Sequence, residues 1–145
     1  MQQTLLKEIM KTPVIIVRIG DPFRRVEEKL RVHGIRHLPV IDSRSKVVGI
    51  ITQRDLYRII SPRKTDDGDF TYDPQSLDSF ILKRVMTPNP ALLGPEDSVA
   101  QAVKMMAAGR YGCIPIVGPD KEIVGIVTQT DILRFVARWL HETED

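Results

Sequence analysis

The stretch Val48-Gly49-Ile50-Ile51-Thr52-Gln53-Arg54-Asp55 occurs a second time as Val124-Gly125-Ile126-Val127-Thr128-Gln129-Thr130-Asp131. The copies lie 76 residues apart, and the offset also relates Met10 to Met86. It holds without a gap for roughly fifty positions, the length of one small structural repeat. The sequence therefore predicts two copies of one structural unit.

The composition is that of a globular protein. Of 145 residues, 42% are hydrophobic and 28% are charged, which excludes a disordered chain. No apolar run approaches the roughly 20 residues that span a bilayer, and residues 1–8 lack the apolar core of a signal peptide. The single cysteine, Cys113, excludes an internal disulfide. We therefore expect a cytoplasmic protein with no membrane span.

The charge is uneven along the chain although the net charge is only +2. Residues 1–64 hold 14 Lys+Arg and 6 Asp+Glu, whereas residues 65–145 hold 7 and 13. Two interpretations stay open. The charges form ordinary solvated faces, or the first repeat faces a phosphorylated ligand or a negatively charged partner.

Each copy has the pattern of a β-α-β-β-α unit. In the first copy we expect a strand over residues 14–17 and a helix with Asp21 as N-cap that ends near Gly34. Strands over residues 38–41 and 47–51 follow, and a helix begins at the Thr-x-x-Asp. In the second copy the elements are residues 91–93, a helix from Asp97 to near Gly109, strands 114–117 and 123–127, and a helix through Leu140.

A unit of about 50 residues is small for a stable core of its own. We therefore expect an α/β fold in which two small sheets pack face to face with helices outside. The predicted boundaries are 1–62 for repeat 1 with an N-terminal lead-in helix, 63–76 for a linker loop, and 77–145 for repeat 2. The second repeat has its own lead-in helix, and its final helix is extended.

The Thr-x-x-Asp pattern supports two interpretations. A Thr at a helix N-terminus, with free backbone N–H groups around it, is a ready site for a phosphate. An Asp three residues later can accept hydrogen bonds from a ribose diol. The same pattern is also close to a capping box, which stabilises the helix without any ligand. The two roles are compatible.

These features resemble a tandem pair of cystathionine-β-synthase (CBS) domains, often called a Bateman module. The resemblance rests on the two Thr-x-x-Asp units, the Met-initiated segments 10–13 and 86–89, and the segments 37–42 and 113–117. It covers roughly residues 5–140. It implies two repeats related by a pseudo-two-fold axis, with ligand clefts between them.

The resemblance also implies a regulatory module without catalysis of its own. Such modules bind adenosyl ligands such as AMP, ADP, ATP or S-adenosylmethionine, and they pair into flat, disc-like homodimers. It implies no obligatory cofactor, with AMP favoured as the regulatory ligand. Because no catalytic domain is evident, we expect any regulated activity to lie in an unidentified partner protein.

By this resemblance, Asp55 and Asp131 hold ribose, and Thr52 and Thr128 hold phosphate. We expect the base to lie in an apolar slot in each copy. The slot residues are Thr12, Pro13, Val14, Ile15, Arg36 and His37 in the first copy, and Pro88, Pro90, Ala91, Tyr111, Gly112 and Cys113 in the second. Val14, Ile15 and Ala91 equally fit an ordinary strand core.

The copies differ at the predicted phosphate end. Arg54 stands where the second copy has Thr130, and Arg36 stands where it has Gly112. Because a guanidinium binds phosphate oxygens in a bidentate manner, we expect the first site to prefer more phosphate. The second site is then expected to prefer AMP or an adenosyl ligand with an uncharged tail.

Other candidate sites are weaker. His33 and His37 have a metal-binding spacing, but Gly34 falls between them and ends the helix, so no metal site is predicted. Cys113 has no acid–base partner nearby, and residues 66–69 lack the remaining ligands of a calcium loop. Trp139, with its neighbour Leu140, packs within the chain or at a dimer contact.

No pair of residues forms a nucleophile–base or acid–base set, so we expect no enzyme activity. The chain also lacks a helix-turn-helix or an aromatic-basic ribbon, which argues against nucleic-acid binding. The sequence thus predicts a stand-alone module that senses an adenosyl nucleotide and signals to a partner. The alternative is a ligand-free structural dimerisation module.

Overall fold

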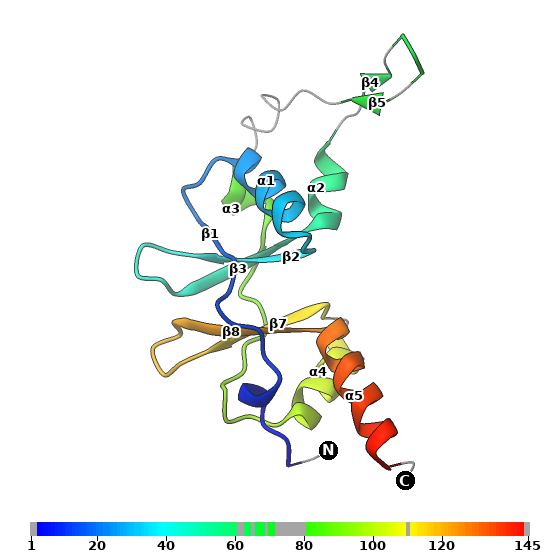
Figure 1. The fold of residues 1–145 in the computed structure, drawn as a ribbon. Helices are drawn as coiled ribbons and strands as arrows, with labels where there is room; N and C mark the ends of the chain where they lie inside the picture. Colours follow the sequence, from blue (N-terminus) through cyan, green and yellow to red (C-terminus); the bar gives the residue numbers. More distant parts are fainter. Residues whose placement is uncertain are drawn as a thin grey trace. The chain divides into compact units, whose positions relative to one another are not determined.

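A computed structural model describes residues 3–60, 63–64, 66–68, 70–71, 81–109 and 111–143 (Figure 1). The chain forms two compact units, each built around one copy of the repeated motif. The Asp55 unit contains Ile15–Ser43 and Val48–Asn89. The Asp131 unit contains Met1–Val14, Arg44–Val47 and Pro90–Asp145.

The Asp55 unit is built on a sheet with strand order β1-β2-β3-β6. Strand β1 runs parallel to β2, and β6 runs antiparallel to β3. A separate short ribbon joins β4 to β5. The elements of this unit are β1 (Val17–Arg18), α1 (Phe23–His33), β2 (His37–Ile41), β3 (Val47–Thr52), α2 (Gln53–Ile59), β4 (Arg63–Lys64), β5 (Phe70–Thr71), α3 (Leu82–Val85) and β6 (Thr87–Pro88).

The Asp131 unit repeats this plan with shorter pairing at its edges. Strands β7 and β8 form an antiparallel hairpin in which Cys113 lies opposite Thr128. In place of β1 and β6 there are single bridges, Leu93 to Ile116 (parallel) and Lys11 to Ile126 (antiparallel). The elements are the 3-10 helix η1 (Leu6–Glu8), α4 (Val99–Gly109), β7 (Cys113–Val117), β8 (Ile123–Thr128) and α5 (Gln129–Thr143).

The two lead-in segments are exchanged between the units. Leu82 and Met86, which precede the second repeat, belong to the hydrophobic core of the first repeat. Leu6 is fully buried in the core of the second repeat, where Ile9 and Met10 also pack. Figure 1 shows the dark blue N-terminal segment with α4 and α5, and the green α3 with α1 and α2.

The predicted domain boundaries followed chain order and assigned each lead-in to the repeat after it. The compact units instead combine each lead-in with the other repeat. Within the described residues the lead-ins contain short helices, of three residues in η1 and four in α3. The linker predicted at 63–76 and the lead-in residues 77–80 lie largely outside the described residues.

The β-α-β-β-α order of each repeat is confirmed, but the first strands are shorter than predicted. Only Val17–Arg18 forms a strand in the first copy, and only Leu93 makes a bridge in the second. The hairpin strands are close to the prediction and buried along most of their length. Continuous apolar runs therefore marked these strands correctly.

The predicted Asp N-caps were wrong. The Asp21 carboxylate accepts the N–H of Arg18 at 2.9 Å, and α1 begins after Pro22. At the same offset, Asp97 accepts the N–H of Gly94 at 2.7 Å. Both carboxylates therefore fold back onto the preceding loop instead of capping the helix. Helix α1 ends as expected at Gly34, which adopts the left-handed conformation with φ 61°.

Candidate ligand-binding site

Both Thr-x-x-Asp motifs form a reciprocal cap where a strand enters a helix. Thr52 Oγ1 accepts the N–H of Asp55 at 3.2 Å. In return, Asp55 Oδ2 accepts the backbone N–H of Thr52 at 2.9 Å and its hydroxyl at 3.1 Å. The second copy has the same three bonds, at 3.3, 2.9 and 3.0 Å. The capping role is therefore confirmed.

The cap uses only one oxygen of each carboxylate. The other oxygen, Oδ1, faces a cation at a longer distance. In Asp131 it lies 3.4 Å from Lys11 Nζ, and in Asp55 it lies 3.9 Å from Arg58 Nη1. The Asp131 side chain is only 5% exposed and that of Asp55 15%. Each motif thus holds a nearly buried carboxylate whose second oxygen retains capacity to accept hydrogen bonds.

The glycine of each motif allows the exchanged lead-in to approach the strand. A Cβ atom at Gly49 would lie 2.4 Å from Met86 Sδ, and one at Gly125 would lie 2.4 Å from Met10 Sδ. These methionines precede the residues that pair with the strands, Thr87 and Lys11. The repeated glycine therefore lets each methionine pack closely against the strand that leads into a Thr-x-x-Asp.

In the second copy the predicted slot residues before the hairpin meet the motif directly. The N–H of Gln129 donates to the carbonyl of Gly112 at 3.1 Å, and Gln129 Nε2 donates to the carbonyl of Tyr111 at 3.1 Å. Cys113 pairs with Thr128 across the hairpin. Burial raises the pKa of the Cys113 thiol to about 12, which keeps it protonated at neutral pH.

The first copy has the same arrangement with more positive charge. The N–H of Gln53 donates to the carbonyl of Arg36 at 2.8 Å, and both Arg36 and Arg54 are exposed. His37 opens β2, the neighbour of β3, which ends at Thr52. Burial, and secondarily the Arg36 charge, lowers the pKa of His37. His37 is therefore a neutral group near pH 7.

The residues of each predicted ligand-binding set are distributed over both compact units. Thr12, Pro13 and Val14 were grouped with Asp55 but belong to the Asp131 unit. Pro88 was grouped with Asp131 but belongs to the Asp55 unit. The other predicted residues share a unit with their own Asp: Ile15, Arg36, His37, Thr52 and Arg54 with Asp55, and Pro90, Ala91, Tyr111, Gly112, Cys113, Thr128 and Thr130 with Asp131.

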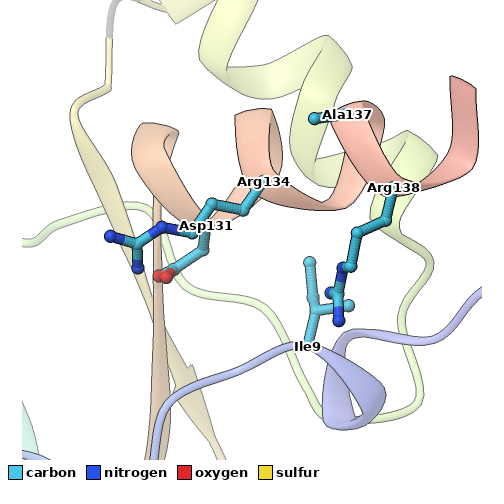
Figure 2. A pocket seen from close by; sticks show the side chains of 5 residues that line it. All are labelled: Ile9, Asp131, Arg134, Ala137 and Arg138. Carbon is cyan, nitrogen blue, oxygen red and sulfur yellow. The ribbon is translucent and has the colours of Figure 1, made fainter. Parts of the chain in front are cut away.

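Sequence reasoning missed a cationic group beside Asp131. A cavity of about 380 Å³ is lined by Ile9, Asp131, Arg134, Ala137 and Arg138. Figure 2 shows Arg134 and Arg138 projecting from the same side of α5 as Asp131, with Ile9 across from them. The 3.6-residue period of a helix carried a signal, since positions 131, 134 and 138 share one face.

The described residues contain no group of three or more His, Cys, Asp or Glu side chains that could hold a metal ion. In the same part of the chain, no helix has the length and apolar character needed to cross a membrane.

A family model of the CBS domain matches residues 6–62 and again residues 82–138. The chain belongs to the CBS domain family. Its mixed α/β fold of small sheets and helices is that of CBS domain pairs, which are regulatory modules and not catalytic domains. The resemblance drawn from the sequence is thus confirmed.

Among curated proteins, the chain is similar to an inosine-5′-monophosphate dehydrogenase of Korarchaeum cryptofilum, with 34% identity over 82% of this chain and 21% of the relative. The first curated relatives are much longer, and the chain spans about a fifth to a quarter of their length.

Among solved structures, the CBS domain pair of protein MJ0100, in complex with 5′-methylthioadenosine and S-adenosyl-L-methionine, has a TM-score of 0.73 and 27% identity. The alignment covers 92% of this chain and 99% of that one. The AMP complex of CBSX2 has a TM-score of 0.75 at 20% identity, over 93% and 97% of the two chains. The CBSX2 match shows a shared fold.

Proposed function

We propose that this chain is a regulatory module that binds an adenosyl ligand at its Thr-x-x-Asp motifs and signals occupancy to a partner protein. The observation that carries the proposal is that the two oxygens of each carboxylate make different contacts. Oδ2 completes the helix cap, while Oδ1 lies 3.4 Å from Lys11 Nζ in Asp131 and 3.9 Å from Arg58 Nη1 in Asp55. A ribose diol offers two hydroxyl donors that suit this second oxygen.

The surrounding groups suit the rest of such a ligand. The first turns of α2 and α5 present backbone N–H groups and a partial positive charge to a phosphate or other electron-rich group. Tyr111, Gly112 and Cys113 lie beside Thr128, where backbone and apolar groups can contact a base. The complex of protein MJ0100 shows adenosyl compounds bound to a similar domain pair.

A second candidate function is a ligand-free module that holds two copies of the chain together. The observation that favours it is the apolar surface of α5, where Leu133 is 68% exposed, Leu140 49% and Trp139 37%. Large apolar groups on one helix commonly mark an interface. A homodimer through α5 is compatible with ligand binding, so only the empty-site version competes with the first proposal.

Thermal unfolding with a panel of ligands separates the two. AMP, ADP, ATP, S-adenosylmethionine and NAD are each added to the full chain at millimolar concentration. A ligand at about 100 times its Kd stabilises the folded state by roughly 2.7 kcal/mol, which raises Tm on the order of 5–10 °C for a chain of this size. An unchanged Tm with every ligand would leave the structural module as the function.

Asparagine substitutions then test the assignment of the carboxylates. Asp131→Asn and Asp55→Asn keep one acceptor for the cap but replace the other oxygen by a donor. Each is expected to leave the unliganded Tm nearly unchanged and to reduce the ligand shift. The control is Asp97→Ala, which removes the carboxylate that accepts the Gly94 N–H away from the motif. It is expected to lower Tm and keep the full ligand shift.

A further inference from the structure

The two Asp carboxylates differ in the residue that the exchanged lead-in places beside them. Lys11 reaches Asp131, whereas the position 76 residues later, which pairs with the strand before Asp55, is Thr87. We propose that Lys11 makes the Asp131 site select adenosyl ligands with an anionic 5′ end over those with a neutral or cationic one. This inference rests on the function proposed above and names the ligand class of one site.

The backbone of Lys11 is fixed against the strand that carries the motif. Its N–H donates to the carbonyl of Ile126 at 2.9 Å, and its carbonyl accepts the N–H of Ile126 at 3.1 Å. The preceding Met10 packs against Gly125, where any side chain would collide with it. The fixed backbone of Lys11 therefore places its ammonium group within reach of Asp131. The flexible four-carbon side chain still allows the ammonium to pair with another anion.

Ligand binding changes what Lys11 can pair with. In the structure its ammonium lies 3.4 Å from Asp131 Oδ1, the oxygen that ribose hydroxyls would engage. A 5′-phosphate beside the ribose gives the ammonium a new anionic partner. The thioether of methylthioadenosine gives it none. The sulfonium of S-adenosylmethionine places a like charge at the 5′ position, and its carboxylate lies farther along the methionine chain. At the 5′ position the loss of the original ion pair is thus compensated by a nucleotide and by neither of these ligands.

The neighbourhood of Asp131 reinforces this selection. The cavity beside it is lined by Arg134 and Arg138, and among the described residues Asp131 is its only acidic lining residue. In the first copy, Arg58 corresponds to Arg134, but Thr87 replaces Lys11 and proline 62 replaces Arg138 in the sequence. The second site therefore gains two cations that the 76-residue offset does not repeat.

This bears on the expected order of phosphate preference. The differences between Arg54 and Thr130 and between Arg36 and Gly112 favoured more phosphate at the first site, and AMP or an adenosyl ligand with an uncharged tail at the second. Lys11 of the exchanged lead-in pairs with Asp131, and Arg138 of the extended α5 lines the same cavity as Asp131. Their charge favours AMP over an uncharged tail at the second site.

The test measures AMP and 5′-methylthioadenosine affinities by isothermal titration calorimetry on the full chain. The background is Asp55→Asn, so that the Asp131 site alone reports. Adding Lys11→Thr is expected to weaken AMP about tenfold, the usual scale for one charge-assisted contact. The affinity for methylthioadenosine is expected to stay the same or improve. The reciprocal variant, Thr87→Lys in an Asp131→Asn background, is expected to raise the preference for AMP.

Equal weakening of both ligands by Lys11→Thr would overturn the inference, because it would show a structural role for the lysine. An unchanged AMP-to-methylthioadenosine ratio would overturn it too. If the parent chain binds but the Asp55→Asn protein does not, the Asp131 site binds no ligand, so the inference fails while the proposed function survives at Asp55. Absence of binding in every variant, the parent included, would remove both.

Discussion

Substitution of Gly125 tests the exchange of lead-ins most directly. A Cβ atom there would lie 2.4 Å from Met10 Sδ and 2.9 Å from Met10 Cγ. Overpacking of this kind costs about 1–3 kcal/mol, although replacing a strand glycine by alanine otherwise gains about 0.5–1 kcal/mol. We therefore expect Gly125→Ala to lower the free energy of unfolding by about 1–2 kcal/mol, seen as a Tm lower by roughly 3–8 °C.

A double-mutant cycle identifies the residue responsible. Met10→Ala removes the two atoms closest to the new Cβ, so Gly125→Ala is expected to cost at least about 1 kcal/mol less in that background. Urea unfolding measures each corner of the cycle. The control cycle pairs Met10→Ala with Gly49→Ala, which the structure predicts to be additive because Gly49 faces Met86. Coupling of Met10 to Gly49 instead of Gly125 would refute the exchange.

Three further predictions follow from single groups. Thr128→Ala removes the cap acceptor of α5 and is expected to lower stability by about 1 kcal/mol, measured by urea unfolding; a neutral effect contradicts the cap. Because the pKa of His37 is lowered in the folded chain, the unfolded chain binds this proton at a higher pH than the folded chain does. The free energy of unfolding therefore falls as pH drops below about 6.5. His37→Gln is expected to flatten the dependence of Tm on pH between 7.5 and 5, and an unchanged slope contradicts this. Cys113, with its pKa of about 12, is expected to resist iodoacetamide at pH 8 until urea unfolds the chain, and rapid labelling of the native protein, followed by mass spectrometry, contradicts its burial.

The helices and strands could be predicted well because the two copies share the spacing of their apolar residues as well as residue identities. The hairpin strands were long apolar runs, and the structure buries them as expected. The helix end at Gly34 followed from the conformational freedom of glycine, which the left-handed φ confirms. The Asp21 cap failed because the carboxylate had a second donor within reach, the N–H of Arg18, three residues earlier.

The packing of each lead-in segment in the core of the other repeat could not be predicted, for a different physical reason. Met10 and Met86 are equivalent under the repeat, and so are Gly125 and Gly49. Met10 packs against Gly125, and Met86 packs against Gly49. The sequence pattern therefore allows each methionine to pack in its own repeat or in the other. Chain order favoured the first choice, and the structure has the second. The predicted grouping of Thr12, Pro13 and Val14 with Asp55 likewise followed chain order, whereas these residues belong to the Asp131 unit.

Duplication therefore leaves the sites unequal through residues outside the duplicated motif. Within the motif, the two Asp side chains make the same cap with nearly the same distances. Helix capping fixes the orientation of each carboxylate and leaves Oδ1 facing Lys11 of the exchanged lead-in in one copy and Arg58 of α2 in the other. The lead-in supplies Lys11 to one and Thr87 to the other. Because these segments lie outside the cap, we expect substitutions in them to change ligand preference at little cost to helix stability.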